Sequence, residues 1–118
     1  MSVLWWLIVG HALGDFVLQT DTMAKGKNRH RPADPSSAWS QYLPGWPYWL
    51  AAHALVHGGI VALATGSVLL GLAETAAHAA IDFGKTEKWY GLHFDQFLHI
   101  ACKCLWAALL YFGVVCEP

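Results

Sequence analysis

Four apolar stretches dominate the chain and most constrain what it can fold into. They run from about 3 to 19, 48 to 64, 67 to 83 and 94 to 115. A helix of about 17 to 22 residues, rising about 1.5 Å per residue, crosses a hydrocarbon layer of about 30 Å. Charged residues make up only 13% of the chain and hydrophobic residues 56%. The pattern predicts an all-α polytopic membrane protein, in which residues 1–118 form one antiparallel bundle of four transmembrane helices.

Composition also bears on the competing classes of protein. A soluble four-helix bundle is the alternative fold, but so few charges leave little to cover its exposed faces. A net charge of −1 and the lack of a groove-reading motif argue against a nucleic-acid partner. The first stretch contains His11 and Asp15 and lacks a basic leading region, so it does not read as a cleavable signal peptide.

The basic residues predict how the bundle is oriented. All but one of them lie in the first and third connections: Lys25, Lys27, Arg29, Arg31, Lys85 and Lys88. The exception, Lys103, falls inside the fourth stretch. Because lysine and arginine accumulate on the cytoplasmic side, we expect these two connections in the cytoplasm. Both termini would then be periplasmic, in a bacterial (or phage-host) inner membrane.

The long first connection, residues 20–47, is expected to be an interfacial loop. Asp34 and Pro35 are a plausible cap and first turn of a short helix. Aromatic side chains suited to headgroup depth follow it: Trp39, Tyr42, Trp46, Tyr48 and Trp49. The basic run could touch anionic lipid, although a pure topology signal explains it equally well.

Ionisable residues inside the apolar stretches repeat every four positions. The sets are His11, Asp15 and Gln19; His53 and His57; Glu74, His78 and Asp82; and Asp95, His99 and Lys103. On a helix, a step of four places each set along one face. Counted from the cytoplasmic ends, the four sets fall at matching depths, within about 14 Å of that surface at helical rise. A shared polar site in the cytoplasmic half is therefore expected.

Imidazoles and carboxylates on facing helices are ligands that suit a divalent transition metal. Burying ionisable groups in hydrocarbon costs about 2.5 to 3.5 kcal/mol each on insertion scales, so they should face inward and have partners. The candidate ligands are His11, Asp15, His53, His57, His78, Asp82, Asp95 and His99. This set suits zinc, or else manganese or iron, as one or two ions sharing a bridging carboxylate.

Other roles for these residues stay open. The pair His53 and His57 could ligate haem or relay protons, and Asp15 could carry a proton. Asp95 could cap the fourth helix. The whole set could also be structural, with polar groups holding the helices together.

Three motifs resemble a known family. They are His11-x-x-x-Asp15-Phe16-x-Leu18-Gln19-Thr20, His78-x-x-Ile81-Asp82-x-x-Lys85 and Asp95-Gln96-x-x-His99. Together they resemble an uncharacterised family of small bacterial and phage membrane proteins, over nearly the whole chain. That family is distantly similar to membrane-bound metal-dependent hydrolases. The resemblance implies an intramembrane metal site at the histidines and aspartates of these motifs, with His53 and His57 as additions.

The function that follows is metal-assisted hydrolysis of a lipid-linked phosphate or acyl substrate near the cytoplasmic surface. Glu74 or Asp82 could accept the proton, Lys85 could hold a phosphate, and Gln19 and Gln96 could bind substrate. The competing class is a non-enzymatic membrane component: a metal or proton carrier, a haem protein, or a structural or host-modifying phage protein. Small residues on the helices would also allow a homo-oligomer.

Overall fold

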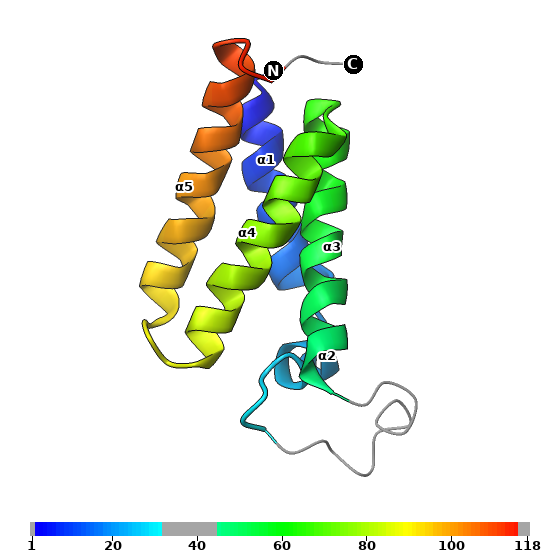
Figure 1. The fold of residues 1–118 in the computed structure, drawn as a ribbon, viewed down its shortest axis with the longest axis vertical. Coiled ribbons are helices and arrows are strands. Elements are labelled where there is room, and N and C mark those ends of the chain that lie inside the picture. The colour runs from blue at the N-terminus through cyan, green and yellow to red at the C-terminus, as the bar shows by residue number, and fades with distance from the viewer. Residues whose placement is uncertain (1, 32–44, 116–118) are drawn as a thin grey trace.

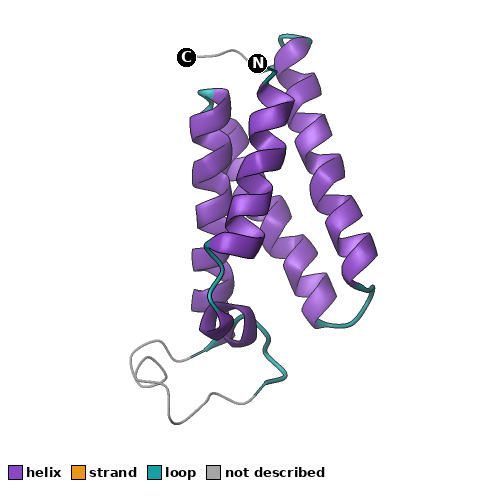
Figure 2. Cartoon of the chain, turned by 180° about the vertical axis from the view of Figure 1, so that it is seen from behind, coloured by secondary structure: helices purple, strands orange, loops and turns teal. Residues whose placement is uncertain are grey.

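The fold is a bundle of helices, and a computed structural model describes residues 2–31 and 45–115 of it (Figure 2). Its elements are α1 (Val3–Ala12), the π-helical η1 (Leu13–Val17), α2 (Asp21–Gly26), α3 (Trp46–Thr65), α4 (Val68–Thr86) and α5 (Leu92–Tyr111). The described part contains no strand, which confirms the all-α prediction. The predicted helix start at Asp34, with Trp39 and Tyr42, lies outside the described residues.

The four long elements form a closed ring of neighbours. Helix α1 packs against α3 and α5, and α4 packs against the same two helices. The turn between α3 and α4 lies at the end of the bundle where α1 begins and α5 ends, whereas α2 and the α4–α5 connection lie at the opposite end (Figure 1). Successive long helices are therefore antiparallel, as predicted, and the two basic connections share one end.

Local capping explains where the helices begin and end. The Ser2 hydroxyl accepts a bond from the backbone N–H of Trp5, and that of Ser67 accepts one from Leu70. Gly66, in the left-handed region at φ 71°, ends α3 and lets the chain reverse within two residues. The connection between the second and third apolar stretches is therefore a tight hairpin.

The first apolar stretch, residues 3–19, is predicted as one uninterrupted helix, but the structure divides it. Its α-helix ends at Ala12 and continues as the π-helical turn η1. The backbone N–H of Leu18 bonds to the carbonyl of Leu13, five residues earlier. A new short helix, α2, then starts at Thr20, whose hydroxyl accepts from the N–H of Met23. The sequence analysis did not predict α2.

The distribution of polarity is the reverse of that in a water-soluble bundle. The fully buried side chains are largely ionisable, and His78, Asp95 and His99 are 0% exposed. Large apolar side chains instead cover the outside: Leu63 is 88% exposed and Phe16 71%. The purely apolar interior is a small cluster at the end near the termini, formed by Leu7, Val61, Leu70 and Trp106.

By length and composition, one described helix qualifies as a membrane span, namely α3. The charged stripes on α4 and α5 lower their hydropathy, and the apolar run Val3–Val17 is shorter. A bundle of four transmembrane helices therefore stays a prediction.

Helices α3 and α4 pack closely because glycines face each other. A Cβ on Gly58 would lie 2.5 Å from the carbonyl oxygen of Gly71 and would collide with Thr75. A Cβ on Gly71 would lie 2.7 Å from the carbonyl of Gly58. Neither backbone oxygen can move aside without separating the helices, so both positions require glycine.

We therefore expect Gly58→Ala to destabilise the protein by about 1 to 3 kcal/mol, the usual cost of overpacking. Gly59→Ala is the matched control, because a Cβ there meets nothing within 4 Å and alanine favours helix. Thermal unfolding in detergent should show a lower midpoint for the first variant only. Equal midpoints for the two variants would contradict this account of the helix contact.

Candidate metal centre

Ionisable side chains from all four long elements converge inside the bundle. Helix α1 supplies His11, η1 supplies Asp15, α3 supplies His53 and His57, α4 supplies Glu74, His78 and Asp82, and α5 supplies Asp95, His99 and Lys103. The rings of His57 and His78 stack at a centroid distance of 3.7 Å, and those of His78 and His99 lie 4.2 Å apart. The predicted shared polar site is thus present as a single buried cluster.

The π-helical turn places Asp15 in this cluster. Such a turn adds a residue to the helical repeat and is frequent at functional sites. It also brings the backbone at Gly14 against α3, where a Cβ would lie 2.5 Å from the imidazole of His57. Gly14 is therefore required for His57 to sit beside Asp15.

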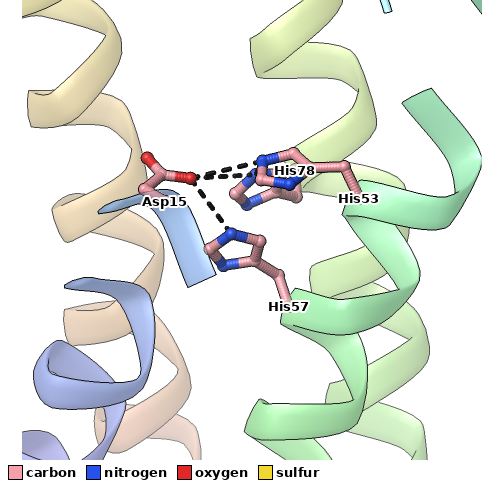
Figure 3. Close-up of side chains that lie close together, drawn as sticks. All are labelled: Asp15, His53, His57 and His78. Atoms are coloured by element: carbon pink, nitrogen blue, oxygen red, sulfur yellow. Dashed lines mark hydrogen bonds and ion pairs between the residues drawn. The ribbon is translucent and has the colours of Figure 1, made fainter. Parts of the chain in front are cut away.

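Asp15, His53, His57 and His78 form the most compact ligand group (Figure 3). Asp15 Oδ1 lies 3.0 Å from His57 Nε2, 3.3 Å from His53 Nε2 and 3.8 Å from His78 Nε2. The Nε2 atoms of His53 and His78 are 3.2 Å apart. Ligands about 2.1 Å from a tetrahedral zinc ion are separated by about 3.4 Å. The four separations given above are close to this value, and all the ligand atoms of the group lie within 4.8 Å of one another.

His78 is held in the orientation that a ligand needs. Its Nδ1 lies 3.3 Å from Glu74 Oε1, and a proton donated there leaves Nε2 bare toward Asp15. Glu74 is itself fixed, since Lys103 Nζ donates to its Oε1 at 2.5 Å and Trp106 Nε1 to its Oε2 at 2.6 Å. A carboxylate behind a metal-binding histidine is the usual arrangement that sets its tautomer.

A second ligand group lies beside the first and consists of Asp82, Asp95 and His99. His99 Nε2 is 3.2 Å from Asp82 Oδ1 and 3.6 Å from Asp95 Oδ1. The other oxygen of Asp82, Oδ2, faces the first group, 3.4 Å from His53 Nε2. The Asp82 carboxylate therefore links the two groups.

Gln96 joins the groups on the α1 side. Its Nε2 donates to Asp15 Oδ2 at 3.0 Å and to Asp95 Oδ2 at 3.2 Å, and its Oε1 lies 3.1 Å from His11 Nε2. His11 then donates from Nε2, so only its Nδ1 could ligate. A third group, His11 with His78 and His99, shares its members with the other two.

Lysines neutralise all but one of the buried carboxylates. Lys103 pairs with Glu74 and Lys27 with Asp82, each at 2.5 Å, and Lys85 lies 3.5 Å from Asp95. Within the described part of the chain, Asp15 has no such partner; its ion-pair neighbours are imidazoles. An unpaired carboxylate is costly in an apolar interior, and the polar neighbours of Asp15 are the imidazoles and the Gln96 amide.

Residues 27–31, which we call the covering segment, lie against the cluster at Asp82 and against Glu87. Lys27 is buried against Asp82, and Arg29 makes a two-point ion pair with Glu87 at 2.5 and 2.9 Å. His30 Nε2 lies 3.1 Å from the same carboxylate. The bonds from Arg29, assisted by His30, lower the pKa of Glu87 from 4.5 to about 2.

The structure brings together all eight residues predicted as metal ligands, together with Glu74 and Gln96. Lys85 lies at the rim beside Asp95, partly exposed. Among the residues that the structure describes, the Gln19 side chain donates only to the backbone carbonyl of Asp15 and bonds to none of the ligand atoms. Both oxygens of Glu74 are engaged, so the geometry favours a positioning role over the predicted proton transfer.

Three members of the site were not assigned a role from the sequence. Lys103 continues the four-residue stripe of α5 from His99, so that signal was present. Trp106 follows by three residues and could be mistaken for an ordinary apolar side chain. Lys27 lies in a basic run that predicts topology, and nothing in its spacing indicates burial against Asp82.

Comparison with known protein families gives one match. Residues 3–115 match the family described as "Protein of unknown function (DUF3307)". The chain belongs to this family, which confirms the expected resemblance to an uncharacterised family. Neither the curated proteins nor the solved structures give a match.

The covering segment should depend on the Glu87 carboxylate. We expect Glu87→Gln to speed tryptic cleavage after Lys25, Lys27 and Arg29 at least several-fold. The reason is that the ion pair between Arg29 and Glu87, which we call the clasp, is lost. Asp21→Asn, which removes only the exposed pair with Lys25, should change little. Since the folded pKa is lowered, the clasp contributes stability above about pH 4.5 and loses it as pH falls toward 2. Equal cleavage of the wild type and Glu87→Gln would refute its role.

Proposed function

We propose that this protein is a polytopic inner-membrane protein that binds a divalent cation and uses it to hydrolyse a membrane-embedded phosphate substrate. The observation that carries the proposal is the group Asp15, His53, His57 and His78, whose ligand atoms all lie within 4.8 Å of one another. Zinc fits this four-ligand set, and manganese or iron fit it with expanded coordination.

The placement in a membrane is supported by the reversed polarity of the bundle. Apolar side chains such as Leu63, Leu69 and Leu72 face outward, whereas the ionisable groups are buried. Helices α3, α4 and α5, of 19 or 20 residues, would each be about 30 Å long. A lipid environment gives the outer leucines and aromatic rings the apolar solvent that water cannot.

The hydrolytic reaction is supported by what surrounds the cation group. A bound divalent ion supplies Lewis acidity, lowering the pKa of water and polarising a phosphoryl oxygen. Asp82 could accept a proton once the Lys27 ammonium, which is paired with its Oδ2 in this structure, has moved away. Lys85 at the rim could bind phosphate charge. The basic residues Lys27 and Lys85 contact the carboxylates of the site, so a phospholipid or another lipid-linked phosphate is the substrate class we favour.

A carrier function fits this arrangement less well. The apolar cluster Leu7, Val61, Leu70 and Trp106 lies beyond the polar site, toward the end that carries the termini, and would interrupt a polar path. Haem ligation by His53 and His57 is also disfavoured, because the centroids of their rings lie only 4.8 Å apart and leave no gap for a macrocycle between them.

The cation proposal predicts metal content. Wild-type protein that resists carbonate extraction from membranes and is then purified in detergent should retain about one divalent ion per chain. Asp15→Asn and His57→Ala should lower the affinity for that ion at least ten-fold, since each removes a ligand. Elemental analysis and competition with a chelator would measure both effects.

Gly14→Ala tests the cation site without substituting any ligand residue. Its Cβ would displace the His57 ring, so we expect about a ten-fold loss of metal affinity, with Gly59→Ala as the matched control. A folded wild type that binds no transition metal, or variants that bind as the wild type does, would overturn the cation site.

The hydrolytic proposal predicts phosphate release from vesicles or micelles that contain phosphate-ester lipids. Asp82→Asn should reduce kcat by about 10² to 10⁴, the range for loss of a general base, and Lys85→Met should mainly raise KM. Cys104→Ser, at an exposed position, should match the wild type. A metal-loaded, folded protein that is inactive toward the whole lipid panel would contradict hydrolysis and leave the cation site standing.

A further inference from the structure

The second ligand group, Asp82, Asp95 and His99, has the chemistry of a cation site of its own. Two carboxylate oxygens lie within 3.6 Å of His99 Nε2, and all three side chains are at most 2% exposed. Asp95 Oδ1, which points to His99, has no hydrogen-bond partner in the described part of the chain. His99 Nε2 is hydrogen-bonded to Asp82 Oδ1, so a divalent ion held between these groups would replace the ring proton and would also satisfy the unpaired oxygen of Asp95.

The two groups are arranged for two ions rather than for one shared position. Asp82 Oδ2 faces His53 and His78 of the first group, at 3.4 and 3.7 Å, while Asp82 Oδ1 faces His99 of the second. A carboxylate divided in this way bridges the ions of two-metal hydrolases, which lie about 3.5 to 4 Å apart.

The charges around Asp82 and Asp95 make the second position weak in this conformation. Asp82 and Asp95 together carry two negative charges, and Lys27 and Lys85 already supply two positive ones. A divalent ion would add a net charge of about +2 to a buried site, which an apolar interior resists. Lys27 belongs to the covering segment, whose other anchor is the clasp between Arg29 and Glu87.

We propose that Asp82, Asp95 and His99 bind a second divalent cation, and that the Lys27 ammonium competes with it for Asp82. This inference rests on the proposed function and assigns its reacting centre. With the bridging oxygen of Asp82, the first group would surround its ion with five ligand atoms, whereas the second group offers three and leaves room for water and a phosphate oxygen. Withdrawal of Lys27 from Asp82 would thus open the second site.

The test is a Mn²⁺ titration of detergent-purified protein, followed by equilibrium binding and by electron paramagnetic resonance. We expect the second Mn²⁺ to bind at least ten-fold more tightly to Lys27→Met than to the wild type, and two bridged ions to show spin coupling. Lys25→Met, on the exposed side of α2, is the matched control and should behave as the wild type. The double variant Lys27→Met/Asp95→Asn should bind one uncoupled ion.

A second variant tests the proposal independently, in case Lys27→Met does not fold. Glu87→Gln leaves the cluster intact but loosens the covering segment, so it should also strengthen binding of the second ion. If both variants bind a single ion with wild-type affinity, the second site is refuted while the first stands. If the wild type binds none, the first site fails instead, so the two proposals are separable.

Discussion

Compensation of buried charge is the constraint on which the rest of this structure depends. Four carboxylates lie inside a bundle whose outer surface is largely apolar, and each needs a positive or polar partner at contact distance. Three of them have a lysine, from three different segments: Lys27, Lys85 and Lys103. The fourth, Asp15, is surrounded by imidazoles. The helices must therefore pack in the one register that brings these partners together, because any slip would strand an unpaired charge.

Close backbone approach makes that register attainable. Gly58 and Gly71 let α3 and α4 come near enough for His53 and His78 to face each other, and Gly14 lets the π-helical turn bring Asp15 against His57. Glycine thus serves the site by bringing the helices together, while the ligands themselves are supplied by larger side chains. Gly58→Ala changes the contact between the helices, whereas Asp15→Asn changes a ligand.

The positive charges divide into two kinds with different consequences. Lys103 lies within α5 and is locked to Glu74, behind His78, so it supports the ligand geometry permanently. Lys27 lies on the covering segment and touches Asp82 itself. A charge that arrives from a separate segment can be withdrawn, whereas one built into a helix cannot. This difference is the physical basis for a cation position whose strength depends on the state of the cover.

The four apolar stretches and their polar stripes could be predicted from the sequence, because a step of four residues fixes one helix face whatever surrounds it. The sequence also named every residue of the two ligand groups. Only the tertiary structure decided which oxygen faces which nitrogen, that Glu74 supports His78, and that Lys27 is buried against Asp82. Those outcomes depend on helix register, on a π-helical turn and on the return of a connection across the bundle, and spacing along the chain carries no information about any of them.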